Sequence, residues 1–134
     1  MNPQIRYALL LCLLSAPAMA DQVEISCATE NQCRAGWEAA RHWVLDHSDF
    51  NVRISTDDLL ETYQPRNASP FEFAARLIKE HSRILADVYC GAEVNVPTRG
   101  LLWHPKAKPC QPDGDTVRQK FRAVVEAAIN EVKS

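Results

Sequence analysis

The stretch FEFAARLIKEHSRILADVYC, residues 71–90, decides the fold because its pattern is compatible with two secondary structures. A helix is favoured by Ser69 and Pro70, which offer an N-cap and a proline at the first helical position, and by Glu72 in the place of a capping-box glutamate. A strand pair is favoured by apolar residues that alternate on both sides of the polar turn 80–82. We predict the strand pair, with these apolar positions: Phe71, Phe73, Ala75, Leu77, Ile84, Ala86, Val88 and Cys90.

A second strand pair is predicted immediately upstream. Residues 50–54 alternate strictly, with Phe50, Val52 and Ile54 as the apolar positions, and residues 55–58 have the composition of a turn before residues 59–63. Asp57 and Asp58 could be imagined as paired catalytic carboxylates, but adjacent acids between two strands are typical turn formers. Residues 64–70, with two prolines, are expected to form a loop.

The chain before these strands predicts a helix over residues 31–47, with Asn31 as a possible N-cap. Apolar residues recur on one face of this helix at Cys33, Trp37, Ala40 and Val44. Gly36 costs about 1 kcal/mol relative to alanine inside a helix, so we interpret it as a close-packing position.

A second helix is predicted at the C-terminal end, capped by Asp113 or Asp115. Its expected apolar face consists of Val117, Phe121, Val124, Ala128 and Val132. Its expected solvent-exposed positions are Arg118, Lys120, Arg122, Glu126 and Glu131. Two helices and about four antiparallel strands predict an α+β domain, with a meander whose one face is covered by the helices.

Residues 1–20 have the organisation of a cleaved signal peptide. Arg6 gives a positive start, residues 7–14 are apolar, and residues 18–20 follow the small-x-small pattern that signal peptidase cuts. The apolar run is shorter than the roughly 20 residues that span a bilayer. We therefore expect cleavage before Asp21, no stable membrane insertion afterwards, and one exported domain over residues 21–134, in the periplasm of a Gram-negative bacterium.

The charge balance bears on the class of partner. The full chain has a formal net charge of −2, and removal of the leader takes away one basic residue, Arg6, and no acidic one. Proteins that bind nucleic acid or anionic membranes carry a basic surplus on one face. We expect no nucleic-acid partner.

Four cysteines remain after the leader: Cys27, Cys33, Cys90 and Cys110. An even number in an oxidising compartment predicts two disulfides, for which three pairings exist. Pairing Cys27 with Cys33 and Cys90 with Cys110 is the least demanding, because the first two are close in sequence and the others bracket one long loop. There is neither a Cys-x-x-Cys motif nor a zinc-type ligand pattern, so no metal or other cofactor is expected.

The order of these features resembles a family of small exported proteobacterial domains of no assigned activity. The resemblance rests on Trp37-x2-Ala40-x2-Trp43, residues 51–57 (NVRISTD), Glu61-Thr62-Tyr63-x-Pro65, Cys90-Gly91 and a later cysteine followed by Gln111-Pro112. It implies a helix, a meander and a closing helix, and so supports strands over residues 71–90. This chain departs from the pattern in carrying nineteen residues between Cys90 and Cys110.

That excursion is part of a long irregular loop predicted for residues 91–112. It contains Leu101, Leu102, Trp103 and His104, three large apolar residues beside an imidazole. Such a group in a tethered loop is typical of a partner-binding anchor, and equally of side chains that fold back over the core.

The sequence carries no nucleophile elbow and no phosphate-binding loop. The expected function is therefore that of a non-catalytic periplasmic binding or accessory protein, whose ligand is either a periplasmic protein partner or a small molecule. One alternative is an inhibitor or immunity protein that uses residues 91–109. A less favoured alternative is a small hydrolase that uses His104 or an acid pair.

Overall fold

The strand pair predicted for residues 71–90 forms the centre of the sheet. A computed structural model, which describes residues 22–65, 69–94 and 109–133, shows β4 (Phe73–Lys79) and β5 (Arg83–Cys90) as antiparallel neighbours. Leu77 and Ile84, one in each strand, are completely buried. The alternative of a helix over these residues is therefore wrong.

Over the described residues the sheet has five strands, not about four. The predicted hairpin is present as β2 (Val52–Ser55) and β3 (Leu59–Thr62), and a further strand, β1 (Gln22–Ser26), pairs antiparallel with β5 to give the order β1-β5-β4-β3-β2. The sequence pattern did not predict β1, because this strand contributes only two residues, Val23 and Ile25, to the core. Its partner strand, β5, begins far along the chain at Arg83.

Helix α1 (Glu30–His47) begins one residue earlier than predicted. Its N-cap is Thr29 rather than Asn31: the Thr29 hydroxyl accepts the Gln32 N–H at 3.2 Å, and the Gln32 side chain accepts the Thr29 N–H at 3.2 Å. The predicted apolar face is buried. A Cβ atom on Gly36 would lie 2.8 Å from Cγ1 of Ile129, so this glycine permits the close approach of the two long helices.

Helix α3 (Gly114–Glu131) is capped by Asp113, whose carboxylate accepts the Thr116 N–H at 3.3 Å. Its predicted apolar face is correct in the first turns, at Val117 and Phe121. Beyond them Val124 is wrong, and Ala128 and Val132 are half-buried. The buried residues there are Val125 and Ile129, whereas Val124 is 45% exposed. Adjacent valines at 124 and 125 satisfy the apolar pattern in two ways, and contact with α1 selects the second.

Arg118 is buried, contrary to the prediction that it faces solvent. Its place in the helix is on the side that meets the end of β5, where its guanidinium donates to the carbonyl of Val88 at 3.0 Å. The sequence pattern assigned it to solvent because arginines are seldom buried without partners.

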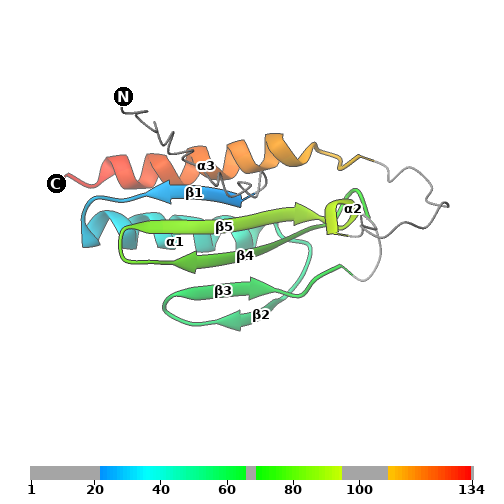
Figure 1. Ribbon diagram of the computed structural model, residues 1–134, viewed down its shortest axis with the longest axis horizontal. Coiled ribbons are helices and arrows are strands. Elements are labelled where there is room, and N and C mark those ends of the chain that lie inside the picture. Colours follow the sequence, from blue (N-terminus) through cyan, green and yellow to red (C-terminus); the bar gives the residue numbers. More distant parts are fainter. Residues whose placement is uncertain (1–21, 66–68, 95–108, 134) are drawn as a thin grey trace, which may run out of the picture.

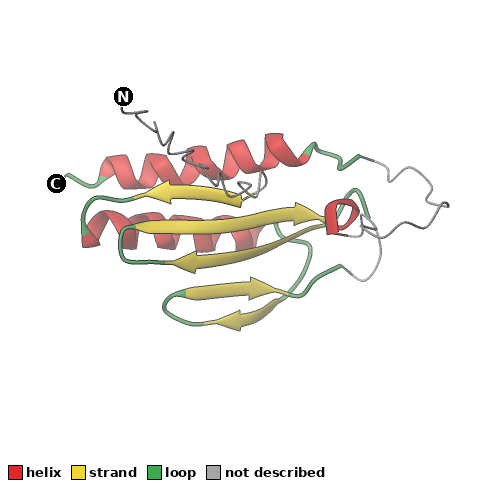
Figure 2. Cartoon of the chain, in the orientation of Figure 1, coloured by secondary structure: helices red, strands yellow, loops and turns green. Residues whose placement is uncertain are grey.

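Both helices lie on the same face of the sheet (Figures 1 and 2). In Figure 1, α1 lies behind β4 and β5, α3 runs along β1, and the β2–β3 hairpin extends to the side. The core fills the space between, with Trp37, Val44 and Phe121 from the helices among its most buried members. No described element covers the opposite face of the sheet.

The two predicted disulfides are confirmed. Cys27–Cys33 joins the residue after β1 to the first turn of α1, with Cα atoms 5.1 Å apart. Cys90–Cys110 joins the last residue of β5 to the segment before α3, with Cα atoms 6.1 Å apart. Residues 91–112, predicted to be irregular, begin with the short helix α2 (Gly91–Val94).

Candidate functional site

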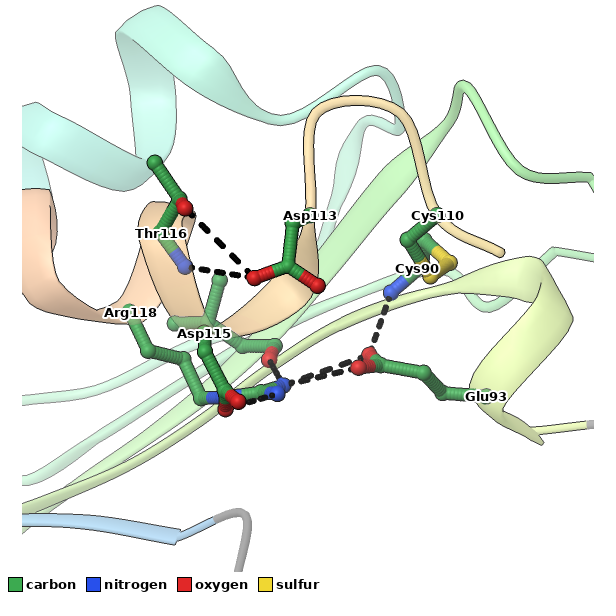
Figure 3. Close-up of polar contacts among 8 residues, drawn as sticks. Cys90, Glu93, Cys110, Asp113, Asp115, Thr116 and Arg118 are labelled. Carbon is green, nitrogen blue, oxygen red and sulfur yellow. Dashed lines mark hydrogen bonds and ion pairs between the residues drawn. A yellow bond between two sulfur atoms is a disulfide. The ribbon is translucent and has the colours of Figure 1, made fainter.

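The Cys90–Cys110 disulfide lies beside a group of charged side chains that joins β5, α2 and α3 (Figure 3). We call Cys90, Glu93, Cys110, Asp115 and Arg118 the anchor cluster. Glu93 is central to it: one carboxylate oxygen accepts the N–H of Cys90 at 3.0 Å, and the other accepts from the Arg118 guanidinium at 3.0 Å.

Arg118 is the cation of the anchor cluster and is paired twice. Besides Glu93, it donates to the Asp115 carboxylate at 2.9 Å. Gly114 makes this arrangement possible, since a Cβ atom there would lie 2.2 Å from the Glu93 carboxylate and 2.8 Å from the guanidinium. A buried charge is tolerated when it is paired and hydrogen-bonded, so the cluster holds the start of α3 against the end of β5.

The anchor cluster is also the one group of metal-ligating residues in the described part of the chain, because the ligand atoms of Cys90, Glu93 and Cys110 lie within 4.8 Å of one another. Metals bind cysteine as the thiolate, and a disulfide has none to offer. The charge of Arg118 further opposes a cation at Glu93. The geometry therefore suits a structural anchor better than a metal site.

Backbone hydrogen bonds fasten a neighbouring segment to the two sides of this disulfide. The carbonyl of Ser69 accepts the Ala92 N–H at 3.0 Å, and the carbonyl of Pro70 accepts the Gln111 N–H at 2.7 Å. The carbonyl of Glu72 accepts the Gly91 N–H at 3.2 Å. Phe71 lies within this fastened segment, and 63% of it is exposed to solvent.

Beside Phe71 is a groove with a volume of about 340 Å³, which we call the aromatic groove. Trp43, Phe71 and Phe73 contribute its aromatic surface, and Pro112 and Val117 its aliphatic surface. Its size is at the lower end of the range of small-ligand pockets, and an apolar lining with a few polar groups is typical of them.

Two polar side chains of the aromatic groove are held in place by the backbone. The Nδ1 atom of His47 lies 2.8 Å from the Trp43 carbonyl, and its ring stacks on Trp43 with centroids 4.3 Å apart. Because a carbonyl can only accept, Nδ1 carries the proton, and Nε2 is left as an acceptor in the neutral ring. One oxygen of Asp49 accepts the Phe73 N–H at 2.7 Å.

A second cavity, of about 390 Å³, lies at the other disulfide, between the start of α1 and the β4–β5 turn. It is lined mainly by polar and charged residues, among them Arg34, Lys79 and Glu80. No phenylalanine, tyrosine or tryptophan lines it, and its one ring is that of the exposed His81. The aromatic groove is therefore the better candidate for a binding site.

Of the residues singled out in the sequence, the structure brings together Cys90 and Cys110 as one bond and Cys27 and Cys33 as the other. Leu101, Leu102, Trp103 and His104 lie outside the described residues. The sequence interpretation missed the aromatic groove. A signal was present, because Trp43 and His47 are four residues apart and so share a helical face.

No protein-family model, curated protein or solved structure matches the chain. Among the described helices, none combines the length and the apolar character needed to cross a membrane.

Proposed function

We propose that this chain is an exported, non-catalytic binding protein that engages a protein partner at the aromatic groove, in the periplasm of a Gram-negative bacterium. We also propose, on the sequence motifs given above, that the chain is related to small exported proteobacterial domains. The two disulfides support an oxidising compartment, since such bonds persist there.

One observation carries the binding role: Phe71 is 63% exposed although its segment is held by backbone hydrogen bonds on both sides of it. An aromatic ring exposed on a fixed support loses little conformational entropy when a partner covers it. Aromatic residues are enriched among those that dominate binding energy.

Selection of peptides from a displayed library on the immobilised protein tests this role. We expect the selected peptides to bind the wild type and to lose at least about tenfold in affinity with Phe71→Ala, because a central aromatic anchor contributes about 1.4 kcal/mol or more. Leu45→Ala is the matched control, since Leu45 is 56% exposed and does not line the groove. Equal binding to all three proteins would remove the proposal.

The alternative role is that of an inhibitor or immunity protein that uses residues 91–109, and it is supported by the closeness of the aromatic groove to the end of this loop in the sequence. The aromatic groove includes Pro112, two residues beyond the Cys90–Cys110 bridge that closes this loop. Trp103→Ala separates the two roles in the same selection. Loss of binding with Trp103→Ala and not with Phe71→Ala would assign recognition to the loop.

A further inference from the structure

The polar part of the aromatic groove is rich in acceptors that the protein has already positioned. Asp49 is tied to Phe73 twice, through its backbone N–H to the Phe73 carbonyl at 3.0 Å and through one carboxylate oxygen. Its other oxygen makes no hydrogen bond to a described residue. His47 adds a ring whose Nδ1 is occupied by the Trp43 carbonyl.

We infer that the aromatic groove receives the side chain of an arginine on the partner protein. This inference rests on the proposed function and adds the chemistry of the partner. A guanidinium is planar, carries five donors and no acceptor, and stacks on aromatic rings. Its apolar stem can lie along Phe71, while its head donates to Asp49.

Other ligands fit the groove less well. A carboxylate would be repelled by Asp49, and a phenylalanine side chain would leave the Asp49 carboxylate without a donor. A tyrosine or tryptophan side chain offers one donor and no charge, so it would make only the weaker kind of hydrogen bond to that carboxylate. A quaternary ammonium ion would stack on the rings but has no N–H to donate. The formal net charge of the chain, −2, favours association with a basic partner.

Lys120 is the one positive side chain among the described residues of the groove. It is exposed, and it makes no ion pair with another described residue. Its ammonium lies on a flexible stem and can move aside, at some expense of affinity for a cation.

The experiment is an NMR titration of the purified protein with acetyl-arginine amide, followed through the amide shifts of His47, Asp49 and Phe71. Acetyl-citrulline amide has nearly the same shape without the charge, and acetyl-trimethyllysine amide has a charged side-chain group without an N–H. We expect both to bind about tenfold more weakly than the arginine compound, because a hydrogen-bonded charge pair is lost in each case.

Variants assign the effect to the groove. Asp49→Asn keeps an oxygen for the Phe73 N–H and should weaken arginine binding about tenfold, with no change for the citrulline compound. Lys120→Ala should strengthen arginine binding. Asp46→Asn is the matched control, because Asp46 is an exposed acid in the last turn of α1, three residues before Asp49, and does not line the groove.

Equal affinity for the arginine and citrulline compounds, or equal affinity for arginine in Asp49→Asn and the wild type, would overturn the inference. So would equal affinity for the trimethyllysine compound, which would assign binding to the rings alone. If any of these equal affinities were found while the selected library peptides still required Phe71, the proposed function would hold and only the arginine inference would fail. If the peptides did not require Phe71, the proposed function itself would fail.

Discussion

Gly114 is the position where one added carbon atom would most directly disturb the anchor cluster. A Cβ atom would overlap the Glu93 carboxylate, at 2.2 Å, so Glu93 or Arg118 must move. We expect Gly114→Ala to lower the free energy of unfolding by about 1–3 kcal/mol, although alanine is the better helix former. Denaturant unfolding measures this.

Gln119→Ala serves as the control for that substitution, since Gln119 is an exposed residue of the same helix. It should change stability by less than about 0.5 kcal/mol. A Gly114→Ala protein as stable as the wild type would mean that the ion pair does not need its observed position.

Arg118 gives the second prediction at this scale. Arg118→Met should leave Glu93 without its cation and lower the free energy of unfolding by about 2–3 kcal/mol, less than for a fully buried pair because the Glu93 side chain is 27% exposed. Adding Glu93→Leu should recover part of the loss, since the unpaired charge is then gone.

Arg122→Met is the comparison for Arg118, because the Arg122 side chain is 42% exposed and its ion pair with Glu126 is a surface one. Its loss should stay below about 1 kcal/mol. If the double variant lost as much free energy of unfolding as the Arg118→Met and Glu93→Leu variants lose together, the two residues would act independently.

At the scale of an element, the two valines of α3 test which face of the helix meets the core. Val125 is completely buried and Val124 is 45% exposed. Val125→Ala should cost about 2 kcal/mol, because a cavity remains, and Val124→Ala less than about 0.5 kcal/mol. Thermal or chemical unfolding measures the stability of both variants. Equal losses of stability would contradict the observed orientation of α3, in which Val125 and not Val124 faces the core.

The open face of the sheet gives a pH-dependent prediction through Tyr89 on β5. Partial burial, together with the negative charges of Glu61 and Asp87, raises the pKa of Tyr89 above its usual value. The folded protein therefore keeps the phenol proton to higher pH than the unfolded chain does. Stability from this difference is complete below the unfolded pKa, about 10, and is lost as the pH rises through the folded pKa.

Tyr89→Phe isolates this effect from the other titrating groups. Above about pH 10, the free energy of unfolding should fall more steeply in the wild type than in the variant. Denaturant unfolding at a series of alkaline pH values measures both slopes, and parallel curves would be incompatible with a raised pKa.

For the whole molecule, the sequence predicted what depends on local periodicity. The face of α1 through Trp37 and Val44 has a spacing that fits a helix. For β4–β5, alternation on both sides of a polar turn favoured the strand pair over the helix that residues 71–90 also allowed. Both disulfides followed from compartment, number and separation. These features need no knowledge of distant contacts.

What the sequence could not give depends on contacts between distant residues. The five residues of β1 become a strand by pairing with β5, and Arg118 becomes buried because Glu93 and Val88 lie opposite it. The aromatic groove likewise combines residues from α1, the segment before β4 and the start of α3. Each residue alone resembles an ordinary surface or core residue.

The Cys90–Cys110 bridge tests the molecule as a whole. Cys90→Ser with Cys110→Ser should lower the free energy of unfolding by about 3 kcal/mol and still allow folding, because the core packs between the sheet and the helices. The Cys27–Cys33 bridge closes a shorter loop, so its removal by Cys27→Ser with Cys33→Ser should lower the free energy of unfolding by about 2 kcal/mol.

Limited proteolysis with mass spectrometry locates the effect of the first pair. Cleavage should increase between residues 91 and 109 before it increases in the core. A uniform rise along the chain, with loss of folding, would show that this bridge is required by the core itself. The same mass spectra should place Asp21 at the start of the mature protein, with no free thiol.

The strand order has a consequence for the time at which the fold can form. Gln22 pairs with Asp87, so among the described strands the one that is synthesised first lies beside the one that is synthesised last. A nascent chain that ends before residue 83 has no partner for β1, and closing so long a loop is slow. β1 therefore cannot pair in the sheet until most of the chain has been synthesised.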